Sequence, residues 1–302
     1  MLNFIALLEN FKELIMKRLI ISCSAFLIGL VSYGQLQVSV SSGYALGSAT
    51  MKLGEKVNVS ETENSYGSYG EGTNVQIRGT YFFNDSFGAD LALGYLNGSD
   101  QTISEVNIPS TNVDAIARAR AFGASASVVY RFTNNIYGRF GALLKVGGKT
   151  EAVVYRKSVF SEDEAAAFGV PEGSYSKTNY KEDFHGHFPI GFVGALGYKY
   201  ELNSNFSIFA EAEYYGISLK RKDSELSEFN TDIVLPDGTV ASSGFYSLDN
   251  LPDGVNKQTT YVDDLSNTNT DTSKVLSQKV PYSSFGINFG VTYTFKRADK
   301  NL

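Results

Sequence analysis

The stretch that most constrains this chain is Phe285 to Phe295, near its end. It reads F-G-I-N-F-G-V-T-Y-T-F, so large apolar residues alternate strictly with glycine, asparagine and threonine. Because successive side chains of a β-strand point to opposite faces, one face of this stretch is an unbroken apolar stripe and the other is small and polar. A soluble antiparallel sheet gives the same alternation, so the number of repeats has to decide between the two environments.

Eight segments of the chain show this alternation, at residues 36–46, 75–83, 87–95, 122–132, 136–146, 190–201, 206–214 and 285–295. Each is about as long as a tilted strand that crosses a membrane. The pattern predicts an all-β protein, an eight-stranded antiparallel transmembrane up-and-down β-barrel. A ten-stranded barrel, with the extra strands taken from the last long connection, is the alternative.

The connections between these segments are of two kinds that alternate. Three are tight and rich in Asn, Asp and Ser, at 84–86, 133–135 and 203–205. These residue types tolerate left-handed conformations and bond to the nearby backbone, which favours hairpin turns. Four connections are long and polar, at about 47–73, 97–119, 148–186 and 221–279. This asymmetry is typical of bacterial outer-membrane barrels, with three short periplasmic turns and four long extracellular loops.

Aromatic residues flank the short turns, at Phe83, Phe87, Phe132, Phe206 and Phe295. Aromatic rings gather where lipid headgroups meet water, so we predict a periplasmic-side aromatic belt. The simpler alternative is that aromatic residues favour strands in general.

The face opposite the apolar stripe carries charges of both signs, at Arg78, Asp90, Arg131, Arg139, Lys145, Lys199, Glu201, Glu211 and Glu213. The interior of an eight-stranded barrel is just wide enough for side chains to fill it. Unpaired charges there are costly, so we predict a lumen charge network that pairs internally and largely fills the barrel. Small residues at other inward positions leave space for water, and a narrow channel is therefore the second interpretation.

Two histidines, His185 and His187, lie beside Asp183 at the predicted outer rim. Two histidines and a carboxylate can hold zinc, and a histidine can act as a base, so a metal site or a rim-located lipid-modifying enzyme is a minority hypothesis. No serine-nucleophile motif or paired-carboxylate signature accompanies them. We therefore predict a non-enzyme with no catalytic residues, metal or cofactor.

Two local structures are predicted in the long loops. Ser161 and Glu164 form a capping box and Gly169 is a stop signal, which predicts a short helix between them. Pro236-Asp237-Gly238 predicts a hairpin turn in the last loop, which is also rich in acidic residues. These acidic loops are available for binding an extracellular ligand.

The N-terminus has the pattern of a cleaved leader. Lys17 and Arg18 precede an apolar core, and Ser32 and Gly34 supply the small residues of a cleavage site before Gln35. We predict a signal peptide over 1–34, with translation starting at Met16, and a barrel domain over 35–302. Lipidation at Cys23 and a retained membrane anchor are the alternatives. Removal of the leader also removes the only cysteine, so the mature chain forms no disulfide.

The net charge of -6 and the pI near 5.1 argue against a nucleic-acid partner. The leader, the eight strands, the alternating connections and the ending F-G-V-T-Y-T-F resemble the small bacterial outer-membrane β-barrel family, of the OmpA/OmpX-like and porin-like kind. The Y-G-Q cleavage region is similar to leaders of Bacteroidetes-type proteins. The resemblance implies the outer membrane of a Gram-negative bacterium, with outer-membrane lipids, lipopolysaccharide and the barrel-assembly machinery as partners. It implies a structural or surface-interaction role, or else a porin-like channel.

Overall fold

The computed structural model describes residues 35–49 and 51–295. The predicted leader, the start at Met16 and Cys23 lie outside the described residues, as does the tail 296–302. Within the described part of the chain, no helix is long and apolar enough to span a membrane.

Eight strands close into a ring in which every neighbouring pair is antiparallel, in the order β1, β4, β5, β7, β8, β10, β11, β17 and back to β1. Their bounds are β1 Gln35–Gly47, β4 Gly72–Phe82, β5 Phe87–Gly98, β7 Thr111–Arg131, β8 Ile136–Val159, β10 Ile190–Glu201, β11 Phe206–Gly216 and β17 Ser284–Thr294. Each of the eight predicted segments overlaps one ring strand. Buried polar and exposed apolar residues alternate along them as predicted, for example Asn288 and Phe289 on β17.

The three short turns are closed by their own polar side chains. Asn84 Oδ1 accepts hydrogen bonds from the backbone N–H groups of Ser86 and Phe87, at 2.9 and 2.8 Å. Thr133 Oγ1 and Asn203 Oδ1 accept equivalent bonds in the other two turns. The left-handed conformation that these residues tolerate is not used, because no described residue other than glycine has a positive φ.

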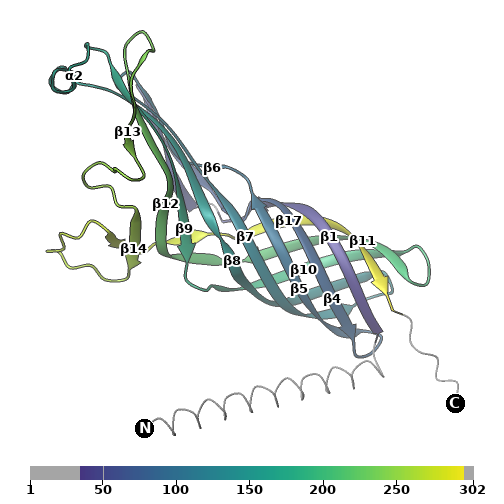
Figure 1. Cartoon of the computed structure of the whole chain (residues 1–302). Helices are drawn as coiled ribbons and strands as arrows, with labels where there is room; N and C mark the ends of the chain where they lie inside the picture. The colour runs from purple at the N-terminus through teal and green to yellow at the C-terminus, as the bar shows by residue number, and fades with distance from the viewer. Residues whose placement is uncertain (1–34, 50, 296–302) are drawn as a thin grey trace, which may run out of the picture.

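Long ring strands continue beyond the ring and, with further strands, form a second region of the same sheet, which we call the extension (Figure 1). In it, β6, β7, β8, β9 and β12 pair in that order, and β2, β3, β13, β14 and β16 join at its two sides. The bounds outside the ring are β2 Met51–Asn58, β3 Thr62–Gly67, β6 Gln101–Ile108, α2 Glu162–Phe168, β9 Tyr175–Gly186, β12 Ser218–Val234, β13 Val240–Ser247, β14 Gln258–Val262, β15 Lys274–Leu276 and β16 Lys279–Pro281.

The extension corrects the prediction of four long loops. The described residues form seventeen strands, and the predicted loops 97–119 and 148–186 consist largely of strand. The ten-stranded alternative is wrong as well, because the strands within 221–279 pair with β9 and with one another, and none of these described strands enters the ring. The sequence does not show the apolar alternation here, because β7 in the extension alternates alanine mainly with charged residues, such as Arg118 and Arg120, and lacks a stripe of large apolar side chains.

A β-bulge marks the boundary between ring and extension on β8. Phe122 of β7 pairs with Gly147 and Gly123 pairs with Lys145, so Val146 is an extra residue. One extra residue exchanges the two faces of all that follows. Lys145 points inward below the bulge, whereas the even-numbered residues Ala152 and Val154 are buried above it. Strand β8 continues past Val146, but its inward and outward residues exchange places there. The segment predicted from the alternation therefore ended at residue 146.

Both local predictions in the loops are confirmed. Ser161 caps α2 in a capping box with Glu164, and Gly169 ends the helix in the left-handed conformation at φ 66°. The chain turns at Pro236-Asp237-Gly238, and Val234 pairs with Val240 across the hairpin of β12 and β13.

Candidate functional site

Two arginine and two glutamate side chains form the centre of a buried charge cluster in the ring. Glu211 of β11 accepts hydrogen bonds from Arg78 Nη1 at 3.1 Å to each carboxylate oxygen, and from Arg139 Nε and Nη2 at 3.1 and 2.9 Å. Arg139 also forms a close ion pair with Glu213. The side chains of Arg139, Glu211 and Glu213 are only 1, 2 and 1% exposed. Because inward residues of opposite strands meet across a narrow ring, the cluster fills its cross-section.

Neutral side chains satisfy the remaining glutamate oxygens. Tyr137 Oη donates to Glu211 at 2.8 Å, Gln76 Nε2 donates to Glu213 at 2.8 Å, and Asn288 also donates to Glu213. These partners were not predicted as part of the network, although they occupy inward positions of the same strands. Their inward-facing positions in the alternating pattern of each strand are the sequence signal that could have identified them.

Asp90 is the exception within the cluster. It is almost fully buried, its Oδ2 lies 3.9 Å from Arg78 Nε, and neither carboxylate oxygen accepts a hydrogen bond from the described residues. With Asp90 the cluster holds three carboxyl groups and two guanidinium groups.

The other predicted members of the charge network lie elsewhere. Arg131 is at the short-turn end, stacked 3.4 Å from the ring centroid of Phe82. Lys199 lies 3.8 Å from Glu201, whose side chain is 66% exposed. Lys145 is at the opposite end and donates to the carbonyl of Gly148 at 3.1 Å. The structure thus places the predicted network in one central cluster and two peripheral groups.

A second, apolar barrier lies where the ring meets the extension, and we call it the plug. Its residues from the long connections are Tyr69, Leu219, Val280 and Tyr282, and they pack on the buried alanines of β7 and β8, Ala117, Ala119, Ala121 and Ala152. The rings of Tyr69 and Tyr282 are 5.8 Å apart, and the Tyr282 hydroxyl is hydrogen-bonded to Thr150. Gly70 is required here, because a Cβ at this position would lie 2.0 Å from the carbonyl oxygen of Tyr282.

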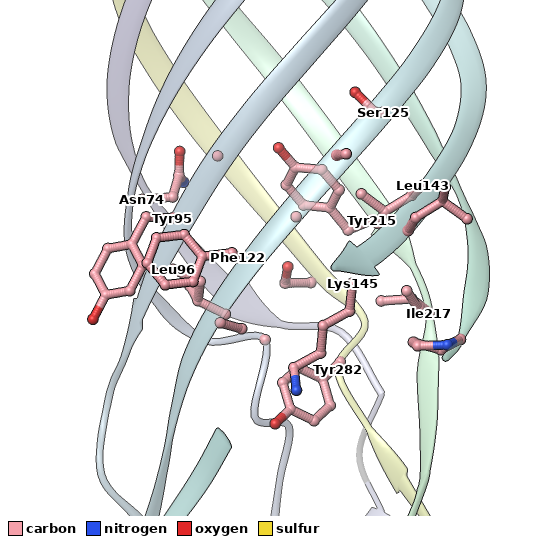
Figure 2. Close-up of a pocket in the computed structure, with 18 of the residues that line it drawn as sticks. Asn74, Tyr95, Leu96, Phe122, Ser125, Leu143, Lys145, Tyr215, Ile217 and Tyr282 are labelled. Atoms are coloured by element: carbon pink, nitrogen blue, oxygen red, sulfur yellow. The ribbon is translucent and has the colours of Figure 1, made fainter. Parts of the chain in front are cut away.

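A cavity of about 110 Å³ lies between the charge cluster and the plug. Figure 2 shows Lys145 pointing towards Tyr282. The Tyr215 hydroxyl accepts a hydrogen bond of 2.6 Å from Gln76, which also donates to Glu213 of the charge cluster. The Lys145 amine is 5.8 Å from the centroid of the Tyr282 ring. Apolar side chains such as Leu143 and Ile217 line much of the rest.

The rim residues Asp183, His185 and His187 do not form one site. His185 Nδ1 is 2.8 Å from Asp223 Oδ1, whereas Asp183 is paired with Lys149 at 2.7 Å. Partial burial acts to raise the pKa of Asp223, but His185 and Lys222 outweigh it and hold that pKa below its ordinary value. Among the residues that the structure describes, no group of three or more His, Cys, Asp or Glu side chains is placed to hold a metal ion.

A groove of about 700 Å³ lies in the extension, far from the ring. Its floor is the face of β8, β9 and β12 that continues the inner face of the ring, and the chain from 245 to 275 and the α2 region form its walls. Seven aromatic residues line it, at Phe160, Phe168, Tyr180, Phe229, Phe245, Tyr246 and Tyr261. This groove was not predicted, because its residues come from segments expected to be loops.

The outer face of the ring is apolar between two aromatic zones. The five predicted belt residues are all exposed at the short-turn end. Tyr130 links Phe87 to Phe132, and Tyr293 links Phe206 to Phe295, through ring contacts of 4.7 to 5.1 Å. A second zone at the opposite end includes the ring pairs Tyr95–Phe122 and Phe192–Tyr214. The strand interval between the zones, such as Phe87 to Tyr95, has the length of about 9–11 residues that a membrane-crossing strand needs.

This fold and this lipid-facing surface define an outer-membrane β-barrel protein. The sequence from residue 23 to 235 matches the family described as outer membrane protein β-barrel domain, and the chain belongs to that family. It is a transmembrane protein of the outer membrane of a Gram-negative bacterium, in contact with membrane lipid. The match ends before β17, which nevertheless completes the ring.

Solved structures with a similar fold are other outer-membrane proteins. OprG of Pseudomonas aeruginosa is 13% identical, with a TM-score of 0.35 over 87% of this chain and 97% of its own. Ail of Yersinia pestis, in complex with the heparin analogue sucrose octasulfate, is 10% identical, with a TM-score of 0.31 over 87% and 97%. A major outer membrane protein of Thermus thermophilus is 10% identical, with a TM-score of 0.38 over 87% and 99%. Among curated proteins, no significant match was found.

Proposed function

We propose that this protein is a closed eight-stranded up-and-down barrel that anchors the extension outside the cell, where the extension binds a partner. The supporting observation is the double barrier in the lumen. The charge cluster and the plug lie one above the other, and the central side chains of the cluster are almost fully buried. A barrel blocked in this way supports a structural or surface-interaction role.

The proposed orientation puts the short turns in the periplasm and the extension outside, as in bacterial outer-membrane barrels. Lipopolysaccharide then surrounds the aromatic zone that includes Phe122 and Phe192, and the barrel-assembly machinery engages the terminal strand with Tyr293 and Phe295. We infer no enzymatic activity and no cofactor. The enzyme hypothesis can be tested at His185, which pairs with Asp223. It requires that an activity of the wild type is lost in His185→Ala.

Planar-bilayer conductance of refolded residues 35–302 tests the closed lumen. We expect silence from the wild type, because ions would have to cross both barriers. A variant that combines Arg139→Ala, Glu211→Ala and Tyr282→Ala removes groups from both barriers and is the positive control. Folding of each protein is checked by its altered electrophoretic mobility without boiling. Reproducible current steps from the folded wild type would contradict the proposal.

A porin-like channel is the second candidate, and the cavity of about 110 Å³ between the barriers favours it. In this alternative the Arg139–Glu213 pair opens as a gate. It predicts discrete wild-type currents that change when Arg139 or Glu211 is replaced, so the same measurement decides between the two candidates.

A further inference from the structure

Aromatic side chains form part of the floor of the groove in the extension. The Tyr180 ring of β9 stacks on Phe229 of β12, with centroids 5.9 Å apart and planes 26° from parallel. Beside it, the hydroxyls of Thr178 and Thr231 share a hydrogen bond of 2.9 Å. Stacking fixes the orientation of the tyrosine ring, so a flat apolar surface bordered by hydroxyl groups faces the groove.

Two charged groups flank Tyr180 without neutralising each other. Arg156 Nε donates to Ser158 Oγ at 3.0 Å, and among the described residues no carboxylate lies within ion-pair distance of Arg156 and no cation lies within that distance of Glu182. Both line the groove, and both act on Tyr180: burial and the nearby Glu182 raise the pKa of its hydroxyl, and Arg156 lowers it. The guanidinium and the carboxylate therefore remain available to a ligand, one as donor and one as acceptor.

The arrangement excludes two common ligand classes. An added peptide strand needs a free backbone edge, but β8 is paired with β7 and β9, and β9 is paired with β8 and β12. A polyanion needs a basic surface, whereas Glu164 and Glu182 line the groove against Arg156 alone. What remains suits a neutral molecule with apolar C–H faces and many hydroxyls, because aromatic rings cover the faces and hydroxyl, amide and charged side chains bond the rim. The volume is in the range of about 300–1,000 Å³ that is usual for small-ligand sites.

We propose that the groove binds a neutral oligosaccharide, with one sugar ring stacked on Tyr180 and its hydroxyls bonded by Arg156 and Glu182. The inference rests on the proposed surface-binding function, and it names the ligand class of that function. The conductance measurement reports on the lumen alone, so a failure of this inference is distinguishable from a failure of the proposed function.

Isothermal titration calorimetry on the full protein, extracted in a detergent without a sugar headgroup, is the test. The probes are maltohexaose, cellohexaose, laminarihexaose, mannohexaose and xylohexaose, and a heparin hexasaccharide is the anionic comparison. We expect at least one neutral probe to bind with one-to-one stoichiometry. Tyr180→Leu is expected to weaken its affinity by roughly tenfold or more, since it removes the stacking ring, whereas Tyr180→Phe keeps most of the affinity.

Tyr155→Leu is the matched control, because Tyr155 is on the same sheet region but not among the groove residues. The Tyr155→Leu protein is expected to bind the neutral oligosaccharide with the affinity of the wild type. Three results would each overturn the inference. The first is that no neutral probe binds the folded wild type at millimolar concentration, and the second is that the folded Tyr180→Leu protein binds as the wild type does. The third is that the heparin fragment binds more tightly than every neutral probe.

Discussion

The two halves of strand β8 have opposite polarity. In the ring, inward Arg139 is charged and outward Phe140 is apolar, whereas in the extension inward Ala152 and Val154 are apolar and outward Lys149 and Glu151 are charged. Lipid covers the outer face of the ring, and the plug covers the part of the inner face of the extension that lies next to the ring. The polarity of a strand face is therefore set by what covers it, even along one continuous strand.

The outer face of the extension carries ion pairs, whereas the described residues on the outer face of the ring form none. Arg118 pairs with Glu151 through its Nη2 at 2.7 Å and with Asp100 through its Nη1 at 3.5 Å. The Lys149 amine lies 3.5 Å from Glu151 and 2.7 Å from Asp183. These side chains form a ladder across β7, β8 and β9, where water can solvate them. In the ring the same strands place their charges inside.

The largest expected effect comes from Glu211→Ala in the ring. It leaves Arg78 and Arg139 buried without their shared partner, and breaking a buried pair costs about 3–5 kcal/mol. Urea unfolding in lipid vesicles measures the free energy of unfolding. Glu201→Ala is the matched control, because this glutamate is also on a ring strand but its side chain is 66% exposed, so little change is expected. Equal effects of the two substitutions would contradict the buried cluster.

The next effect tests which environment covers the outer face of β7. Ala126→Arg puts a charge on the lipid-facing side of the ring, midway between Phe122 and Tyr130 of the two aromatic zones, and is expected to cost about 2–4 kcal/mol. Ile116→Arg on the same face of the same strand lies in the extension, beside Arg118 and Asp114, and is expected to cost far less. The same vesicle unfolding assay compares them. A similar cost at both positions would mean that the boundary between ring and extension is misplaced.

A smaller effect is expected at the bulge itself. Gly148 has a φ of 90°, and a Cβ there would lie 1.9 Å from the carbonyl oxygen of Arg120. Gly148→Ala is therefore expected to cost about 1–3 kcal/mol through backbone strain, and to loosen the extension while the ring stays folded. Trypsin cleavage in the extension, for example after Lys157, measures the loosening. Gly147→Ala is the control, since its Cβ would come no closer than 3.9 Å to Phe122, and faster cleavage in this variant would refute the strain argument.

The smallest effect concerns the ion-pair ladder. Partial burial acts to raise the pKa of Glu151, but hydrogen bonds and charges from Arg118 and Lys149 outweigh it and hold this pKa below its ordinary 4.5. Because the folded-state pKa is depressed, the stabilisation by Glu151 is fully present above the unfolded-state pKa and is lost as the pH falls through the folded-state pKa. We expect it to be less than about 1 kcal/mol, as for other solvated pairs.

Hydrogen exchange of the extension at decreasing pH measures this loss. The protection of β8 amides, corrected for the pH dependence of intrinsic exchange, is expected to fall below pH 4.5 in the wild type, and Glu151→Gln is expected to lose that part of the pH dependence. Glu105→Gln, which removes a charge from the exposed pair with Lys56, is the control and is expected to keep the pH dependence of the wild type. An unchanged pH profile in Glu151→Gln would show that the ladder does not stabilise the extension.

The sequence by itself determined the ring. Period-two alternation in segments such as Phe285 to Phe295 needs no distant partner to be recognised, and turns such as Asn84-Asp85-Ser86 are closed by bonds within a few residues. The capping box of α2 and the hairpin at Pro236-Asp237-Gly238 are equally local. Local geometry therefore made these features predictable.

Only the tertiary structure decided the rest. The bulge at Val146 depends on register with β7, and it determines which residues of β8 face the plug and the groove. Arg78 meets Glu211, and Tyr69 meets Tyr282, across sequence separations of more than a hundred residues. Such contacts depend on which strands the closing ring brings face to face, and alternation along one strand carries no information about its partner across the lumen.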